Sequence, residues 1–196
     1  MKRVGLLLGS FNPLTNAHVG LAKGAVKNGH VDETWFVLSP ANPAKVGKKI
    51  LCDEEHRRTM MREFLKEEGD DTLVLCDIEY DLPRPSYTHT TLGVLKERYP
   101  DVEFYILCGS DTLAKILTWK TGNTILKENR FICNLRAGYD EHKWSDEVKE
   151  RTTFTNFNIP KLSSTDVRGN ISQELTYNDL VPRTISDYIE KHNLYQ

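Results

Sequence analysis

The segment VGLLLGSFNPLTNAH, residues 4–18, passes from an apolar run directly into a turn of glycine, proline and asparagine, and then toward a helix. Val4–Leu8 is hydrophobic at successive positions, which is typical of a parallel strand buried under helices. Gly9 lets the backbone approach a ligand closely, and Asn16 is the predicted N-cap of the helix that carries His18. Because a helix N-terminus just beyond a strand binds anions, the segment predicts a phosphate-facing turn. No Gly-Lys-Ser/Thr follows, so the turn is not a P-loop.

Apolar runs and amphipathic stretches alternate along the rest of the chain. This alternation predicts right-handed βαβ units, and therefore an α/β fold with a single doubly wound, Rossmann-like parallel sheet and helices on both faces. We expect one domain over residues 1–196, with a C-terminal helical part that begins at about 163 and includes a packing helix in LVPRTISDYIEKHNLY. The predicted strands are 4–8, 34–38, 73–76, 104–108 and 131–135, and the predicted helices before the C-terminal part are 18–27, 53–66 and 90–99.

Length and composition limit the classes of protein that fit the chain. Its 196 residues are 39% hydrophobic, enough for one core, and its charged residues of both signs give a net charge of −2. The overall charge and hydrophobic content therefore favour neither nucleic acid nor a membrane as a partner. No run approaches the roughly 20 apolar residues of a membrane span. The four cysteines form no CxxC pair, and the first residues lack signal-peptide architecture. We expect a cytoplasmic protein with reduced thiols.

Two short motifs near opposite ends of the chain carry groups that suit phosphates. Thr15 and His18 lie three residues apart, which places both on one side of a helical turn, where the imidazole can donate to a phosphate oxygen. In LSSTDVR, residues 162–168, hydroxyl side chains can cap a helix from whose first turns Arg168 projects. A helix N-terminus with a guanidinium suits a polyphosphate. The alternatives are a turn with one capping histidine and a plain N-cap with a surface arginine.

The two motifs resemble the signatures of nucleotidyltransferases. GSFNPLTNAH resembles their (H/T)xGH signature, and LSSTDVR resembles their ISSTxxR signature. Three more stretches, RPSYTHTTL, LCGSDTLAKILTWK and LVPRTISDYIEKHNLY, extend a resemblance to nicotinate/nicotinamide mononucleotide adenylyltransferases from the first strand to the last helix. Thr15 and Ala17 stand where the bacterial form commonly has histidine and glycine, whereas RPSYTHTTL is similar to the nicotinate-preferring bacterial branch. The sequence therefore leaves the choice between nicotinate and nicotinamide open, with nicotinate favoured.

This resemblance implies transfer of AMP from ATP to the 5'-phosphate of nicotinate or nicotinamide mononucleotide, which gives deamido-NAD or NAD and pyrophosphate. Because the attacking phosphate is already ionised, no activated serine or cysteine is needed. The site has to align two anions and neutralise the charge that develops on the phosphates. Magnesium (Mg²⁺), bound mainly through phosphate oxygens, would carry much of that neutralisation. We therefore expect no metal ligand from the protein.

The resemblance also implies roles for individual residues on the ATP side. His18 would donate to the α-phosphate, Thr15 would support the phosphates, and Arg168 would hold the β- and γ-phosphates. Asp111 would accept from the ribose hydroxyls, as the acidic residue of a dinucleotide fold does, although a helix cap is its alternative role. The further ATP-binding residues implied are Gly9, Ser10, Phe11, Gly109, Ser163, Ser164 and Thr165.

On the mononucleotide side, the resemblance implies an aromatic platform and a phosphate-binding lysine. Trp119 would stack on the pyridine ring, with a core position as its alternative, and Tyr87 and Thr88 would contact the ring substituent through backbone amides. Lys45, or another lysine of the same loop, would bind the mononucleotide phosphate, although a solvated loop has the same composition. The implied mononucleotide-binding residues are Asn12, Lys45, Tyr87, Thr88, Trp119 and Arg136.

Two other functions stay open. Phosphopantetheine adenylyltransferase shares a TNxH-like start but usually carries lysine where Arg168 stands. A non-catalytic NAD- or nucleotide-sensing module would use the same fold without turnover. The sequence also leaves open whether the chain forms a homo-oligomer. The cluster His56, Arg57 and Arg58, at the start of the second predicted helix, is expected on a solvated face.

Overall fold

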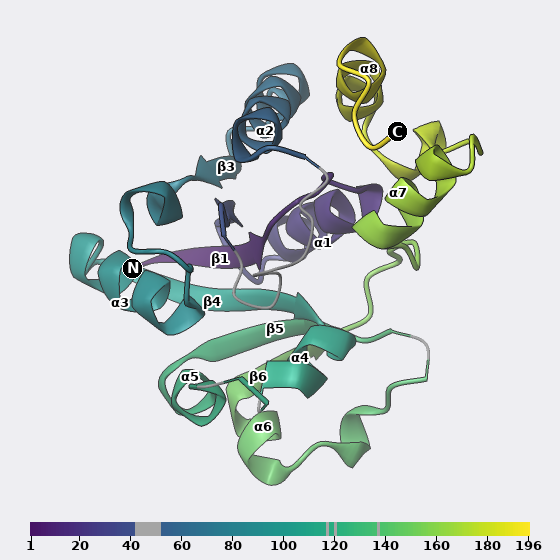
Figure 1. Ribbon diagram of the computed structural model, residues 1–196. Helices are drawn as coiled ribbons and strands as arrows, with labels where there is room; N and C mark the ends of the chain where they lie inside the picture. Colours follow the sequence, from purple (N-terminus) through teal and green to yellow (C-terminus); the bar gives the residue numbers. More distant parts are fainter. Residues whose placement is uncertain (42–51, 117, 120, 137) are drawn as a thin grey trace.

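The computed structural model describes residues 1–41, 52–116, 118–119, 121–136 and 138–196. Its centre is a six-stranded parallel sheet in the order β3-β2-β1-β4-β5-β6 (Figure 1). The order reverses between β1 and β4, and doubly wound folds bind their ligands beyond the carboxyl ends of the strands at such a point. The strands are β1 (Lys2–Gly9), β2 (Glu33–Leu38), β3 (Leu73–Cys76), β4 (Val102–Gly109), β5 (Arg130–Asn134) and β6 (Thr152–Thr155).

Helices cover both faces of the sheet, which confirms the predicted fold class (Figure 1). Successive residues of a strand point to opposite faces, so Leu7 packs into one core with α1, α2, α7 and α8, whereas Leu6 packs into a second core with α3, α4, α5 and α6. The helices are α1 (Asn16–Lys27), α2 (Glu54–Glu68), α3 (Thr88–Arg98), α4 (Ser110–Ile116), α5 (Gly122–Glu128), α6 (Asp146–Arg151), α7 (Ser164–Ser172) and α8 (Arg183–Lys191), and short 3₁₀ helices are η2 (Ile78–Asp81), η3 (Glu141–Lys143) and η4 (Asn178–Leu180).

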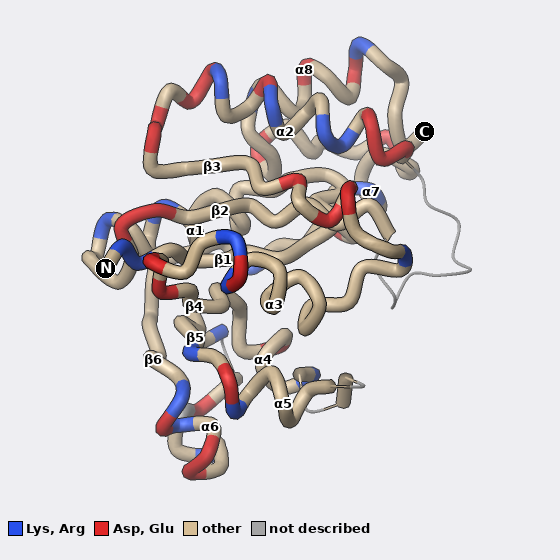
Figure 2. Tube along the Cα trace, turned by 90° about the vertical axis from the view of Figure 1, so that its left-hand side faces the viewer, with Lys and Arg blue, Asp and Glu red and all other residues tan. Residues whose placement is uncertain are grey.

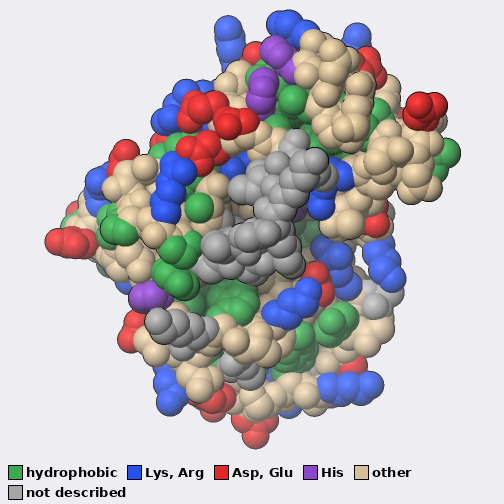
Figure 3. Space-filling model, viewed as in Figure 1, with side chains coloured by type: hydrophobic (Ala, Val, Ile, Leu, Met, Phe, Trp, Pro, Cys, Tyr) green, Lys and Arg blue, Asp and Glu red, His purple; other side chains and the backbone are tan. Residues whose placement is uncertain are grey.

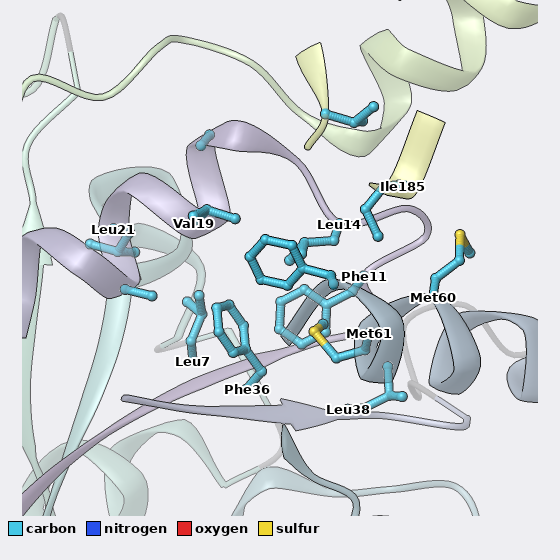
Figure 4. Packing of buried hydrophobic residues seen from close by; sticks show 14 of the residues in the cluster. Leu7, Phe11, Leu14, Val19, Leu21, Phe36, Leu38, Met60, Met61 and Ile185 are labelled. Carbon is cyan, nitrogen blue, oxygen red and sulfur yellow. The ribbon is translucent and has the colours of Figure 1, made fainter. Parts of the chain in front are cut away.

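The first of these cores lies directly behind the loop that follows β1 (Figure 4). Phe11 and Leu14 of that loop point inward, toward Phe36 of β2 and Met61 of α2. Ile185 of α8 reaches the same core and is fully buried. The predicted packing helix near the C-terminus is therefore confirmed, and it packs into the core that supports the loop where a ligand is expected.

The predicted strands and helices agree with the structure to within about two residues at most ends, the scatter expected of element boundaries. Strand β6 was not predicted, because its four residues Thr152–Thr155 are mostly polar and lie at the sheet edge. The short helices α4, α5 and α6 were also not predicted, because six or seven residues are too few for a clear hydrophobic period.

Charged residues of both signs alternate along the outer helices α2, α6 and α8 (Figure 2). Their mixture agrees with the small net charge of −2. Within the described ranges, no helix is long and apolar enough to cross a membrane. All four cysteines, Cys52, Cys76, Cys108 and Cys133, are free thiols.

Candidate active site

The residues predicted for the ATP side lie where β1 and β4 end side by side, in the β1–α1 loop (residues 10–15) and in the first turns of α1, α4 and α7. A cavity of about 470 Å³ opens at this edge of the sheet. Figure 3 shows several Lys and Arg side chains on the right of this face, the side toward which β1 and β4 point in Figure 1. The lining includes His18, Cys108, Gly109, Arg136, Asn158 and Lys161.

His18 is oriented by the residue that caps its own helix. The N-cap of α1 is Thr15 rather than the predicted Asn16, whose side chain instead donates to the carbonyl oxygen of Asp179. The Thr15 backbone N–H donates to His18 Nδ1 at 3.0 Å, and Thr15 Oγ1 lies 2.8 Å from the same nitrogen. Because Nδ1 accepts a backbone hydrogen bond, the neutral imidazole carries its proton on Nε2. The capping box thus presents His18 as a hydrogen-bond donor through Nε2.

Phe11 supports the His18 ring from behind. Its ring meets His18 edge-to-face at 5.2 Å and Phe36 at 5.6 Å, and only 4% of Phe11 is exposed. A Cβ atom on Gly9 would lie 3.2 Å from the Phe11 ring. Gly9 therefore makes room for Phe11, and because the Phe11 side chain belongs to the core, only the backbone of Phe11 can face a ligand.

The second predicted motif docks on the first. Ser163 caps α7 in a reciprocal capping box with Asp166, and the Ser164 hydroxyl donates to the carbonyl oxygen of Pro13 at 2.8 Å. Arg168 Nη1 donates to the carbonyl oxygens of Asn12 at 2.7 Å and of Ser164 at 3.0 Å. Two segments that lie more than 150 residues apart in sequence are thereby joined by side-chain bonds to backbone carbonyls.

Thr165 lies beside the same guanidinium. Its Oγ1 accepts from Arg168 Nη2 at 3.3 Å. The Ser163 hydroxyl is bonded to Asp166 and the Ser164 hydroxyl to the Pro13 carbonyl oxygen. Of these three neighbouring hydroxyls, the one that contacts the Arg168 guanidinium is therefore that of Thr165.

Asp111 and Arg136 form an ion pair over the end of β4. Arg136 Nε lies 3.1 Å from Asp111 Oδ1, and the Arg136 backbone N–H donates to Ser110 Oγ at 3.0 Å. A Cβ atom on Gly109 would lie 2.7 Å from Asp111 Oδ1 and 3.0 Å from Arg136 Nε. Gly109 thus lets the pair lie against the backbone at the cavity wall. The partner of Arg136, which sequence did not identify, is Asp111.

The predicted mononucleotide residues do not lie together: Asn12 is in the β1–α1 loop and Arg136 lies beside Asp111, whereas Tyr87 and Thr88 are at the start of α3. Tyr87 is the N-cap of α3, Thr88 is its first residue, and no side chain of the described residues caps this end. Tyr87 is 38% and Trp119 39% exposed, so a core position for Trp119 is excluded. Lys45 lies outside the described residues.

Arg57 corrects the expectation of a solvated helical face. It is only 2% exposed, and its guanidinium donates to the carbonyl oxygens of Ser10 at 2.9 Å, Ser39 at 2.7 Å and Pro40 at 3.0 Å. The residue therefore fastens the loops that follow β1 and β2 to each other. A signal was present in the sequence, because Arg57 shares a helical face with the buried Met60, Met61 and Phe64.

Known proteins share both the sequence pattern and this fold. The sequence model of the cytidylyltransferase-like family matches residues 6–170. A probable nicotinate-nucleotide adenylyltransferase of Christiangramia forsetii is 31% identical over 197 residues, which cover 100% of this chain and 99% of the relative. The chain belongs to the nicotinate-nucleotide adenylyltransferase family. It is thus a nucleotidyltransferase, as the resemblance of its motifs predicted.

Further members extend the comparison within the adenylyltransferase family. The probable nicotinate-nucleotide adenylyltransferase of Bacteroides thetaiotaomicron is 31% identical, with 97% of this chain and 92% of the relative covered. Among solved structures, the Plasmodium falciparum nicotinic acid mononucleotide adenylyltransferase complexed with NaAD superposes with a TM-score of 0.79 at 27% identity, covering 100% of this chain and 98% of that chain. The same Plasmodium enzyme complexed with APC gives a TM-score of 0.77.

Proposed function

We propose that the protein transfers AMP from ATP to the 5'-phosphate of nicotinate mononucleotide, releasing pyrophosphate and forming deamido-NAD. The observation that carries this proposal is the junction of the two motifs at the sheet reversal. There, Thr15 directs the proton-bearing nitrogen of His18, which lines a cavity of about 470 Å³, and Arg168 is bonded to the adjoining loop through the Asn12 carbonyl oxygen. Family membership and the NaAD complex of the Plasmodium falciparum relative support the same reaction.

In this reaction the mononucleotide phosphate oxygen attacks the α-phosphorus of ATP. The bond from that phosphorus to the bridging oxygen breaks, and the electron pair leaves with pyrophosphate. His18 Nε2–H donates to an oxygen of the α-phosphoryl group as negative charge develops there. Arg168, with Thr165 beside it, binds the β- and γ-phosphates. Ser163 and Ser164 act indirectly, because their hydroxyls hold α7 against the β1–α1 loop.

The donors for a metal ion come from the substrate in this proposal. Within the described parts of the chain, no three His, Cys, Asp or Glu side chains cluster closely enough to hold a metal. Mg²⁺ prefers phosphate oxygens and water to an all-protein cage. We therefore propose that Mg²⁺ arrives with ATP, where it neutralises phosphate charge, while the protein positions the phosphates through His18 and Arg168.

The nicotinate preference rests on the start of α3. Its first turn, Thr88–Thr91, contains no acidic residue, and no described side chain caps it. The positive end of the helix dipole favours an anion by about 0.3 to 1 kcal/mol, and nicotinate carries a carboxylate where nicotinamide has a neutral amide. The exposed rings of Tyr87 and Trp119 are available to stack on a cationic pyridine.

A buried carboxyl group holds this turn in place. Glu79, 3% exposed, accepts a hydrogen bond from Thr91 Oγ1 at 2.8 Å. Burial raises the pKa of Glu79, so the group keeps its proton to a higher pH than an exposed glutamate. Glu79 thus tethers the first turn of α3 through the Thr91 hydroxyl, next to the proposed pyridine site.

Pyrophosphate release tests the proposal. The purified protein is assayed with ATP and Mg²⁺ and, in parallel, nicotinate mononucleotide, nicotinamide mononucleotide and phosphopantetheine. We expect release with nicotinate mononucleotide, with a higher kcat/KM than for the nicotinamide form. Release with phosphopantetheine alone would show that phosphopantetheine, and not a pyridine mononucleotide, is the substrate. No release with any of the three would favour a nucleotide-sensing module.

A further inference from the structure

We propose that Tyr195, the penultimate residue, is a positioning residue that sets the geometry of the β1–α1 loop for adenylyl transfer. The inference rests on the proposed function and concerns a residue that the proposed mechanism does not use. Tyr195 is only 6% exposed, and its hydroxyl donates to Asn12 Oδ1 at 2.7 Å. These two residues are separated by 183 positions in sequence. Tyr195 thus contacts the middle of the β1–α1 loop.

The direction of this hydrogen bond follows from the chemistry of a buried phenol. Burial raises the pKa of Tyr195 well above its ordinary value, so the hydroxyl stays protonated and can donate at any working pH. The oxygen of the Asn12 amide therefore faces Tyr195, and the NH₂ group points to the opposite side of the amide. Tyr195 fixes which end of Asn12 is presented away from the core.

Asn12 is held from a second side as well. Its main-chain carbonyl oxygen accepts from Arg168 Nη1 at 2.7 Å, and the preceding Ser10 carbonyl oxygen accepts from Arg57. The β1–α1 loop around Asn12 is thus bonded to three other parts of the chain: Arg57 of α2, Arg168 of α7, and Tyr195. Since α1 starts directly after this loop, a displaced Asn12 would shift His18 and Arg168 relative to each other.

The backbone of Tyr195 also departs from ordinary geometry. Its φ is +68°, in the left-handed region that a bulky residue rarely adopts. Such a conformation persists only where the surrounding contacts determine it. The hydrogen bond to Asn12 and the burial of the ring are contacts of that kind.

The test compares Tyr195→Phe with Tyr188→Phe. Both tyrosines are 6% exposed and follow the start of α8. Each phenylalanine variant loses one hydroxyl contact, because Tyr188 OH lies 3.0 Å from His56 Nδ1. We expect Tyr195→Phe to lower kcat about tenfold while the KM values change less than about twofold, because a small displacement of aligned reactants slows the chemical step. Tyr188→Phe should keep the wild-type kcat, with a decrease in melting temperature of similar size.

A double-mutant cycle identifies the path of the effect. Asn12→Ala should lower kcat, and adding Tyr195→Phe to Asn12→Ala should lower it no further, since Tyr195 acts through Asn12. A Tyr195→Phe enzyme with unchanged kcat and a lower melting temperature would overturn the inference and leave a purely structural tyrosine. Equal losses in the two backgrounds would overturn it too. Failure of the proposed function looks different, because the wild-type protein would then release no pyrophosphate.

Discussion

The two sides of the site differ in how their polar groups are satisfied. On the phosphate side, His18 is bonded to Thr15, and Arg168 is bonded to Asn12. On the pyridine side, the start of α3 has no side-chain cap among the described residues, and Tyr87 and Trp119 are each more than one-third exposed. The proposed phosphate side is thus built by contacts within the protein, whereas in the proposed function the donors and rings of the pyridine side would be completed by the substrate.

This difference matches the demands of the two tasks. Groups that stabilise developing charge act best when they are already oriented, because no reorganisation is then needed during the reaction. Groups that select a substrate gain by leaving donors that only the correct ligand satisfies, since a wrong ligand leaves them unpaired. We therefore expect substitutions on the phosphate side to lower kcat, and substitutions on the pyridine side to change the preference between mononucleotides.

Removing the His18 imidazole should have the largest effect. In the proposed reaction His18 donates to the α-phosphoryl group, and loss of one such donor typically lowers kcat by about 100- to 1000-fold. Steady-state pyrophosphate release measures the change, with circular dichroism as the check on folding. His142→Ala, which removes an exposed histidine of η3, is the control. Strong residual turnover by His18→Ala would remove His18 from its assigned role.

Arg168→Ala should rank second. Hydrogen bonds to charged groups contribute about 1.5–3 kcal/mol, so kcat/KM for ATP should fall roughly 10- to 100-fold. Arg168→Lys keeps the charge and loses the planar fork, and its value should lie between those of the alanine variant and the wild type. Arg183→Ala, whose side chain is 88% exposed, serves as the control. If ATP kinetics were unaffected in Arg168→Ala, another group would have to hold the β- and γ-phosphates.

A pair of glycine substitutions tests the packing of the two sides. Gly109→Ala forces a Cβ atom to within 2.7 Å of Asp111 Oδ1, and such overpacking typically costs about 1–3 kcal/mol of unfolding free energy. Gly93→Ala in α3 meets no described atom within 4 Å and should stabilise by about 0.4–1 kcal/mol. Urea unfolding measures both. A stable Gly109→Ala enzyme with normal activity would show that the Asp111–Arg136 pair can shift freely.

A smaller change in substrate preference should follow when the start of α3 loses a hydrogen bond. Thr91→Val removes the hydroxyl that donates to Glu79, so the start of α3 loses one tether. We expect the ratio of kcat/KM for nicotinate over nicotinamide mononucleotide to fall about two- to fivefold, the size of a helix-dipole effect. Thr91→Ser keeps the hydroxyl and should restore the ratio. Equal ratios in the serine and valine variants would remove this tether from substrate selection.

The smallest predicted effect is on how the free energy of unfolding changes with pH. Burial raises the pKa of Glu79 in the folded state above its unfolded value. The stabilisation by Glu79 is therefore fully present below the unfolded pKa and is lost as pH rises through the folded pKa. The melting temperature of Glu79→Gln minus that of the wild type should therefore increase as pH rises from about 4. Glu97→Gln, on an exposed residue of α3, is the control. A difference that is flat with pH would mean that Glu79 titrates normally.

Much of the fold and part of the site followed from the sequence. The buried parallel strands are continuous apolar runs, so Val4–Leu8 and the later runs identified the sheet. Because the carboxyl ends of parallel strands meet at one edge, the placement of Gly9 and Gly109 together also followed from the pattern. The individual roles of the predicted ATP and mononucleotide residues, Lys45 included, stay predictions.

Other features depended on contacts that no local pattern encodes. Arg57 bonds to three backbone carbonyls from two loops, and carbonyl positions are set only by the folded chain. The bond from Tyr195 to Asn12 spans 183 positions. The observed N-cap of α1 is Thr15 and not the predicted Asn16, because His18 completes a capping box with Thr15 from a position that glutamate or glutamine usually occupies.

Preassembly of the phosphate side can be measured on the free protein by ¹⁵N NMR of its histidines, with His18→Gln used to assign the signal. If Thr15 orients the ring as the geometry indicates, His18 is a neutral imidazole with the proton on Nε2 and an unprotonated Nδ1 before any substrate is added. A proton on Nδ1 in the neutral ring would show that the donor facing the α-phosphate is not built in, and that substrate itself must assemble the site.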